Sequence, residues 1–252
     1  MILVAFILFL IEVIGINGQE GGMLTGAHLY FRKEYQLGAF IHTAGWGITA
    51  SYAKRLTGFT KLVFSTDFFN LKHPKEAKVE QTLMPGGRPY VFGKEFTTSV
   101  WTLESGFKKV LYVKDRAKGV QISFAGMGGM ALFLRKPVYV VVAYPNVINP
   151  DRITVEKYNV DKHTPLMIKE GAPFIYGLDE IRVIYGASFK TFIEMDMAVN
   201  PSRIFTLNGG IIMQVSSRKI ELLRYNGETR FFLNLFVGLT FGWKKYYDSD
   251  SK

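Results

Sequence analysis

The chain has 252 residues, of which 21% are charged and 15% are aromatic, and it contains no cysteine. This composition is too apolar for a disordered chain and too polar for a bundle of membrane helices, and the missing cysteine excludes disulfides, thiolate metal sites and cysteine nucleophiles. The formal net charge of +10 is scattered through turns rather than gathered on a basic helix. We therefore expect outer-membrane lipid and lipopolysaccharide as partners, and no nucleic acid.

The first segment of the chain predicts export. Ile2 to Ile16 is apolar except for Glu12, and polar residues begin at Asn17. This length suits the apolar part of a secretory signal peptide and is short for a membrane-spanning helix. We predict a signal peptide at residues 1–18, cleaved near Gly18, and a location in the outer membrane of a Gram-negative cell.

The rest of the chain consists of short apolar runs separated by Gly, Asn or Lys turns, without helical periodicity. It predicts an all-β protein: an antiparallel transmembrane β-barrel over residues 19–243, followed by a polar tail at 244–252. The barrel is expected to have about 10 to 12 strands, within a range of about 8 to 14. The expected strands are Thr25 to Arg32, Tyr35 to Thr43, Trp46 to Lys54, Phe59 to Asn70, Tyr90 to Glu104, Phe107 to Lys114, Lys118 to Ala125, Leu132 to Tyr144, one near Ile181, Ala187 to Val199, Ile204 to Val215 and Phe231 to Trp243.

The last strand has one wholly apolar face, because side chains alternate between the two faces of a strand. Its length suits a strand that crosses a bilayer at a tilt. The candidate lipid-facing residues are Phe231, Leu233, Leu235, Val237, Leu239, Phe241 and Trp243.

Two preceding strands alternate polar with apolar residues. Their candidate lumen-facing residues are Glu194, Asp196, Asn208 and Gln214. A polar inner face opposite an apolar outer face is the arrangement of a membrane barrel. A soluble secreted β-barrel, with the apolar face inward, fits the same alternation.

Two long connections, Leu71 to Pro89 and Pro145 to Gly177, are rich in proline and charge. In outer-membrane barrels the long loops face outward and the short turns face the periplasm, so we expect both segments to be exposed loops. The first holds a candidate loop motif formed by Lys72, His73, Pro74, Lys75 and Glu76.

That motif is part of a family resemblance. The stretch Tyr35 to Glu76, with His42-Thr43-Ala44-Gly45-Trp46-Gly47 and Asn70-Leu71-Lys72-His73-Pro74-Lys75-Glu76, resembles an uncharacterised family of Bacteroidota outer-membrane β-barrel proteins. Tyr90 to Lys94 and Lys136 to Tyr139 are similar to the same family, whereas Glu95-Phe96-Thr97 departs from it. The resemblance implies a Gram-negative outer-membrane barrel and no transferable activity.

The sequence does not assemble a recognisable catalytic or cofactor site. The four histidines have no serine partner on the same strand face, no Gly-x-Ser-x-Gly elbow occurs, and no complete metal-ligand set is present. Gly126-Met127-Gly128-Gly129 lacks the Lys and Ser or Thr of a phosphate-binding loop and predicts a bulge or bend in a strand. We expect no enzyme and no cofactor.

Two functions remain. The first is a structural or accessory barrel in a larger outer-membrane assembly, such as secretion or barrel-insertion machinery, with other outer-membrane proteins as partners. The second is a small passive pore or solute channel. A lipid-modifying enzyme of the outer membrane ranks below both.

Overall fold

The computed structural model describes residues 31–79, 87–113, 119–144, 152–198, 200 and 202–246. The expected signal peptide at 1–18 and most of the expected strand at Thr25 to Arg32 lie outside these residues. Among the residues described, no helix is long and apolar enough to span a membrane.

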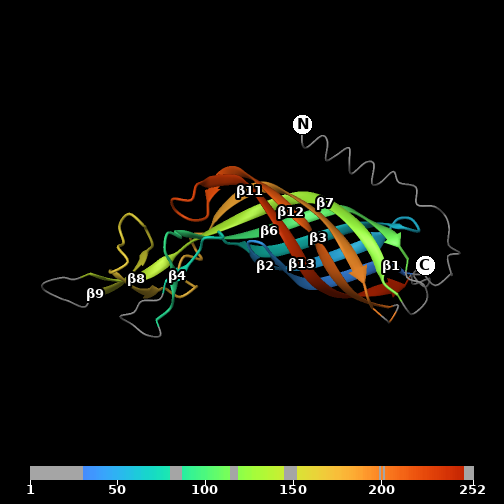
Figure 1. Cartoon of the computed structure of the whole chain (residues 1–252), viewed down its shortest axis with the longest axis horizontal. Coiled ribbons are helices and arrows are strands. Elements are labelled where there is room, and N and C mark those ends of the chain that lie inside the picture. Colours follow the sequence, from blue (N-terminus) through green and yellow to red (C-terminus); the bar gives the residue numbers. More distant parts are fainter. Residues whose placement is uncertain are drawn as a thin grey trace.

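Eight antiparallel strands form a closed barrel, in the order β1-β13-β12-β11-β7-β6-β3-β2 (Figure 1). They are β1 (Phe31–His42), β2 (Gly45–Arg55), β3 (Thr60–Leu71), β6 (Phe96–Tyr112), β7 (Gln121–Pro137), β11 (Arg182–Asp196), β12 (Arg203–Glu221) and β13 (Glu228–Tyr246). The first and last strands pair with each other, so the barrel has no free edge. A closed ladder satisfies every main-chain group of a strand internally, which lipid requires.

The register of the ladders fixes the tilt of the strands. Paired residues followed once around the barrel from Phe231 return to β13 at Phe241, a stagger of ten residues. The path runs through Val215, Ala187, Met130, Leu103, Thr66, Ala50 and Leu37. With strands about 4.8 Å apart and a rise of about 3.3 Å per residue, this stagger tilts the strands by about 40° from the barrel axis.

Eight strands lie at the lower end of the expected range because several expected strands are joined. The strands expected at Tyr90 to Glu104 and Phe107 to Lys114 meet in β6, and the strand expected at Lys118 to Ala125 meets the first part of that at Leu132 to Tyr144 in β7. The remaining part of the latter, Tyr139–Tyr144, is a separate strand, β8. The last strand continues to Tyr246, so the barrel does not end at residue 243. These long strands run without a break past the short-range turn signals that separate the expected strands.

The Gly126-Met127-Gly128-Gly129 segment is not the bulge or bend that the sequence predicts. It lies in the middle of β7, and its pairing to β6 and β11 keeps a constant register. A Cβ atom on Gly129 would overlap the carbonyl oxygen of Leu103 on β6. Glycine here therefore permits close approach of regular strands.

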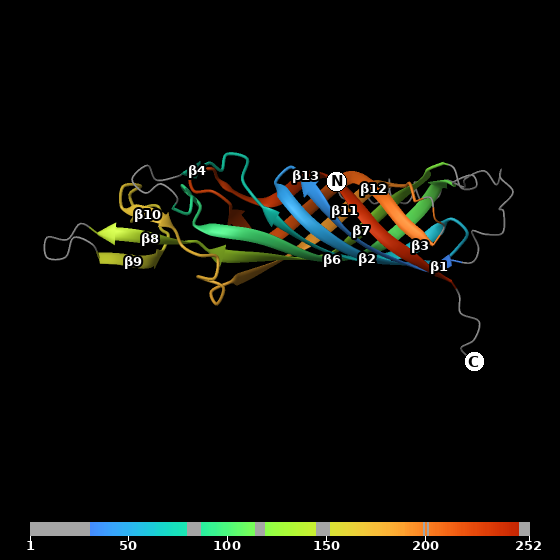
Figure 2. The same ribbon diagram turned by 90° about the horizontal axis from the view of Figure 1, so that it is seen from below.

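A second structure, which we call the head, extends beyond one end of the barrel (Figures 1 and 2). Its three-stranded sheet has the order β10-β8-β9, formed by β8 (Tyr139–Tyr144), β9 (Arg152–Lys157) and β10 (Ile168–Gly171). A two-stranded ribbon joins β4 (Lys78–Val79) to β5 (Tyr90–Val91). The segment Pro145 to Gly177, expected as a loop, thus contains two strands and forms most of the head.

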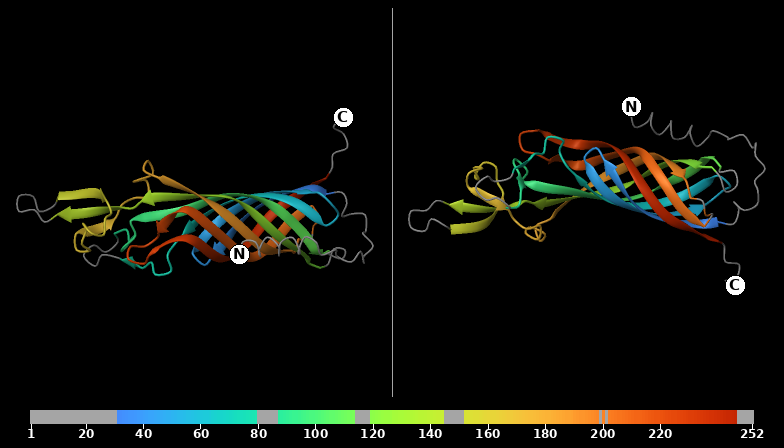
Figure 3. Two further views of the ribbon diagram at one scale, coloured as in Figure 1. Left: turned by 90° about the horizontal axis from the view of Figure 1, so that it is seen from above. Right: turned by 60° about the horizontal axis from the view of Figure 1, so that its bottom comes forward.

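The head marks one end of the barrel (Figure 3). The connections β1–β2, β3–β6, β7–β11 and β12–β13 lie at the head end, and the described ends of the chain, Phe31 and Tyr246, pair with each other at the opposite end. Long connections and described chain ends therefore lie at opposite ends of the barrel.

Candidate functional site: the barrel lumen and the head

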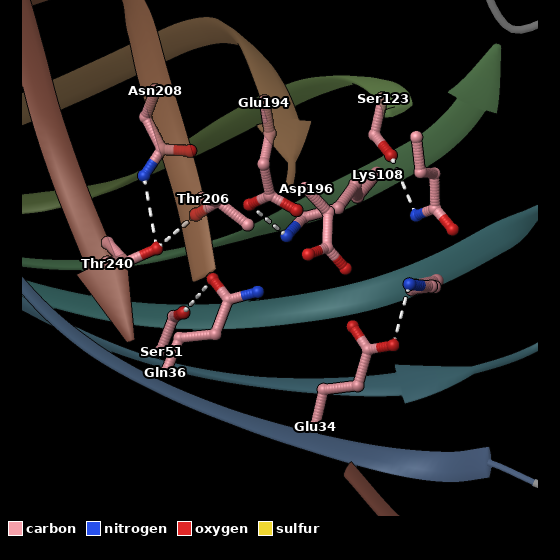
Figure 4. Close-up of polar contacts among 12 residues, drawn as sticks. Glu34, Gln36, Ser51, Lys108, Ser123, Glu194, Asp196, Thr206, Asn208 and Thr240 are labelled. Atoms are coloured by element: carbon pink, nitrogen blue, oxygen red, sulfur yellow. Dashed lines mark hydrogen bonds and ion pairs between the residues drawn. The ribbon is translucent and has the colours of Figure 1, made fainter. Parts of the chain in front are cut away.

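The barrel interior holds the polar side chains. All four candidate lumen-facing residues, Glu194, Asp196, Asn208 and Gln214, are buried inside it. Figure 4 shows Asn208 and Thr206 of β12 directed at Thr240 on the neighbouring strand β13. Asn208 Nδ2 donates to Thr240 Oγ1 at 3.3 Å, and the two threonine hydroxyls are hydrogen-bonded to each other.

Four lysines pair with carboxylates inside the barrel. The pairs and their N–O distances are Lys61–Glu34 (2.7 Å), Lys108–Glu194 (2.6 Å), Lys190–Asp67 (2.6 Å) and Lys244–Asp196 (3.0 Å). Figure 4 shows Lys108 from β6 and Glu194 from β11 meeting in the lumen. An unpaired buried charge is costly, so each partner makes the other tolerable.

Lys190 also lies among aromatic rings. Its Nζ is 5.4 Å from the ring centroids of Phe40 and Phe192 and 5.0 Å from that of Phe236. Rings at this distance attract a cation through their quadrupole. Charged and aromatic groups together fill the middle of the barrel.

Little free space is left between these side chains. The lumen cavity lined by Phe40, Lys108, Lys190, Glu194 and Phe236 has a volume of about 20 Å³. A cavity of this size holds about one water molecule. At this cavity the side chains of the described residues fill the lumen, as is usual for barrels of about eight strands.

The outside of the barrel is apolar. All seven candidate lipid-facing residues of β13 point outward, and their exposed fractions range from 44% to 59%. Trp46 and Trp101 are exposed toward the head, whereas Trp243 stacks on Tyr35 at the other end, with centroids 6.0 Å apart. Charges inside and exposed apolar side chains outside invert the pattern of a soluble barrel.

The candidate loop motif forms a tight turn at the head end of β3. Glu76 N donates to His73 O at 3.0 Å, and Glu76 Oε1 accepts from His73 N at 3.0 Å. The Glu76 carboxylate also pairs with Lys94 at 2.7 Å, with both side chains largely buried. Lys72 N donates to Ala44 O at 2.8 Å, which ties the turn to the β1–β2 connection. The hydrogen bonds and the ion pair of the motif thus hold the turn in place. Within the described residues, no group of three or more metal-ligand side chains occurs in the motif or elsewhere.

One face of the head sheet packs on a small core. This core is formed by Tyr90, Val140, Val142, Tyr158 and Ile168. The hydroxyl of Tyr158 accepts a hydrogen bond from Gly93 N at 3.2 Å, in the segment that leads into β6. The sheet is therefore a folded unit tied to the barrel end.

Glu156 of β9 joins polar groups of the head. Its carboxylate accepts hydrogen bonds from Lys162 Nζ at 2.7 Å, Tyr144 Oη at 3.1 Å and Thr154 Oγ1 at 3.2 Å. These bonds, chiefly that from Lys162, lower the pKa of Glu156 to about 2. The carboxylate is ionised at neutral pH and links β9 to the turn that follows it.

β9 is an open edge of the head sheet. Val138 O accepts from Tyr158 N, and Tyr139 O accepts from Ala172 N on the β10 side. Because main-chain groups alternate in direction along a strand, Thr154 and Glu156 bond to β8, and Ile153, Val155 and Lys157 point their N–H and C=O groups away from the sheet. Within the described residues these outward groups have no main-chain partner.

Sequence analysis did not identify the lysines of the lumen ion pairs or the open edge of β9. Lys190 has the same strand parity as Glu194 and Asp196, so the lysine and the two acids share a face. That parity is the signal that would have placed the lysine in the lumen. The β-branched run Ile153-Thr154-Val155 is the signal that would have predicted a strand at Arg152–Lys157, but it does not show that this strand lies at an open edge.

No family model matches the chain, and no curated protein matches it. Among solved structures, Ail, the attachment invasion locus protein of Yersinia pestis, is similar at 7% identity with a TM-score of 0.43, over 86% of this chain and 99% of that chain. A second structure of Ail, in complex with the heparin analogue sucrose octasulfate, gives a TM-score of 0.40 at 7% identity over the same shares.

Proposed function

We propose that this protein is a non-conducting, non-enzymatic outer-membrane barrel that presents its head to a partner protein, which adds an extended strand to β9. The observation that carries the proposal is the open edge of β9 on a folded sheet held outside a closed barrel. This role is accessory in kind: the barrel supplies the attachment and the head supplies the contact within a larger outer-membrane assembly.

The barrel suits attachment to a membrane. Its outer face is apolar from Phe231 to Trp243 of β13, and four lysine–carboxylate pairs lie inside. A protein with this surface is stable where hydrocarbon surrounds it and water does not. The head end carries the long connections, which in outer-membrane barrels face outward, so the head is available to a partner outside the cell or to a neighbouring outer-membrane protein.

The head suits binding of an extended peptide. An open edge offers alternating donors and acceptors, and a partner strand satisfies them by main-chain hydrogen bonds. Ile153 and Val155 are exposed on the sheet face opposite the small core, where they give a partner strand apolar contact beside the edge. Main-chain bonding supplies affinity, and these side chains supply selectivity.

A proline exchange at the edge tests the proposal. Val155→Pro removes an outward N–H and leaves the bonds to β8 in place, because proline is tolerated where the N–H faces solvent. Thr154→Pro is the matched control that breaks a hydrogen bond within the sheet. A photo-crosslinker at Lys157, followed by purification from native membranes, should capture one protein from cells with the unchanged edge and lose it with Val155→Pro.

Capture is compared only among variants whose barrel is folded, as measured by heat-dependent mobility in gels. Unchanged capture by a folded Val155→Pro protein contradicts strand addition at β9. A folded protein that captures nothing from its own membranes, with the edge intact, also contradicts the proposed role.

The alternative is a passive pore, and the lumen opposes it. The pairs and the rings around Lys190 leave a cavity of about 20 Å³, which is too small for a continuous column of water. The purified protein in planar bilayers should therefore show no steady conductance. Stable single-channel steps would favour the pore.

A further inference from the structure

The turn between β10 and β11 presents the most exposed pair of neighbouring apolar residues on the described surface. Phe174 and Ile175 are 72% and 76% exposed. The turn projects sideways where the head joins the barrel, as the gold loop beside the arrowhead of β7 in Figure 2. Tyr176 N donates to Pro173 O at 3.1 Å, and Leu178 N donates to Ile175 O at 3.3 Å, so two successive turns shape it.

This turn is held in place by the end of β7. Lys136 Nζ donates to Phe174 O at 3.0 Å and to Tyr176 O at 2.8 Å, and it lies 4.7 Å from the centroid of the Phe174 ring. Gly177 has a φ of +81°, and a Cβ there would lie 2.8 Å from the Tyr139 ring. Hydrogen bonds from Lys136 and the positive φ of Gly177 thus hold the turn in a conformation that exposes two apolar side chains. An ordered exposed apolar patch marks a surface that is covered in use.

The apolar outer surface of the barrel extends furthest toward the head on β11, the strand that follows the turn. On β11 the outward residues Val183 and Tyr185 are 46% and 66% exposed, and Val183 pairs with Leu134 of β7. On β6 the outward residues beyond Trp101 toward the head are the polar Ser99 and Thr97.

The ladder register gives the difference in height. Leu103, Met130 and Ala187 are successive partners across β6, β7 and β11, and each step toward β11 rises about 3 Å along the axis at a tilt of about 40°. Val183 is four residues nearer the head than Ala187, and Trp101 is two residues nearer than Leu103. At about 2.5 Å of axial rise per residue, Val183 lies about 10 Å nearer the head than Trp101.

We propose that the Pro173–Leu178 turn enters the outer leaflet of the membrane and fixes how the barrel lies in it. Phe174 and Ile175 lie among acyl chains near the headgroups, and the exposed cation of Arg182 and that of Lys136 lie at the level of the anionic headgroups. The occupant is lipid because the turn lies at the head-end limit of the outer apolar surface, where Leu134 of β7 pairs with Val183 of β11 and the charged residues Lys136 and Arg182 follow. The inference rests on the membrane location of the barrel and is independent of strand addition at β9.

Because the chain contains no cysteine, single cysteines test this directly. Three variants are compared, Ile175→Cys, Leu166→Cys and Val237→Cys, in vesicles of phosphatidylcholine and phosphatidylglycerol. Leu166 is an 84% exposed apolar residue of the head, in the connection between β9 and β10, and Val237 lies on the outer face of β13. Each reacts with a charged, membrane-impermeant thiosulfonate. The thiolate is the reacting form, and each unit by which an apolar surrounding raises the thiol pKa slows the reaction about tenfold.

We expect Val237→Cys and Ile175→Cys to react at least about tenfold more slowly than Leu166→Cys. Adding Lys136→Met should speed the reaction at position 175 and leave position 237 unchanged, because it releases the turn. A bimane fluorophore on Ile175→Cys should be quenched by lipids that carry a spin label near the headgroup.

The outcomes separate this inference from the membrane location. If Val237→Cys reacts slowly but Ile175→Cys reacts as fast as Leu166→Cys, the inference is overturned, whereas the membrane location of the barrel stands. Equally slow reaction at positions 175 and 166 also overturns it, because protection would then not be specific to the turn. Fast reaction at all three positions overturns the membrane location as well.

Discussion

Arginine placed along the outer face of β13 gives the sharpest test of how the barrel meets the membrane. The five positions Leu233, Leu235, Val237, Leu239 and Phe241 all point outward. At a strand tilt of about 40°, neighbours two residues apart differ by about 5 Å in height, so the scan covers about 20 Å of an apolar band about 25 Å tall.

The cost of each arginine follows from its height. Val237→Arg, near the middle, should destabilise the barrel by about 2–4 kcal/mol, and the cost should fall toward about 0–1 kcal/mol as the interfaces are approached. Leu233 and Phe241, about 10 Å from the centre, should give intermediate or small values because a long arginine side chain reaches the headgroups. Val155→Arg is the matched control, an exposed valine of the head, and should cost about 0–0.5 kcal/mol.

The assay is reversible folding into bilayers, with the free energy of unfolding measured by denaturant titration of each variant. A cost that peaks near Val237 and falls on both sides supports a lipid-facing strand. A flat profile, or a variant that folds without detergent or lipid, refutes the reasoning, because burial and not membrane depth would then set the cost.

Three further results are expected. Lys108→Met should cost about 3–5 kcal/mol by leaving Glu194 buried and unpaired, whereas the double variant with Glu194→Met should recover most of that loss; a double variant that costs as much in denaturant titration as the two single variants together would show that the pair is not coupled. The head should lose stability as pH falls from about 4.5 through 2, because folding lowers the pKa of Glu156 to about 2 and its ionised form is the one that is hydrogen-bonded. Hydrogen exchange across that range should show Glu156→Gln to be insensitive where the unchanged head is sensitive, and Lys162→Met should weaken the same transition. Protease added to whole cells should cut first within the long connections of the head end; protection there with cutting in the short turns of the other end would reverse the orientation.

The closed lumen explains how the barrel stays rigid without a disulfide. Strands with glycine and alanine on their inner face approach closely, and lysine–carboxylate pairs with aromatic rings fill the remaining space. The same filling that stabilises the barrel removes a route for solutes. This filled lumen is consistent with the attachment and presentation that we propose.

Alternation along single strands determined much of this protein without any tertiary information. The apolar odd positions from Phe231 to Trp243 define an apolar face of one strand, and the acids Glu194 and Asp196 define a polar face of another. Because successive strand side chains point to opposite sides, the sequence separates the two faces of each strand. It does not state which face is inside, since a soluble barrel reverses the two without changing the period.

Only the tertiary structure decided the strand count, the charge pairing and the head. Continuity of β6 and β7 depends on neighbours that keep a glycine-rich segment in register, and pairs such as Lys108–Glu194 join residues 86 positions apart in the chain. The edge of β9 is open because β9 stands last in the order β10-β8-β9, with β8 on one side and no described strand on the other. Local sequence reports the period of a strand, whereas register, closure and free edges are properties of which strands meet, and long-range pairing sets them.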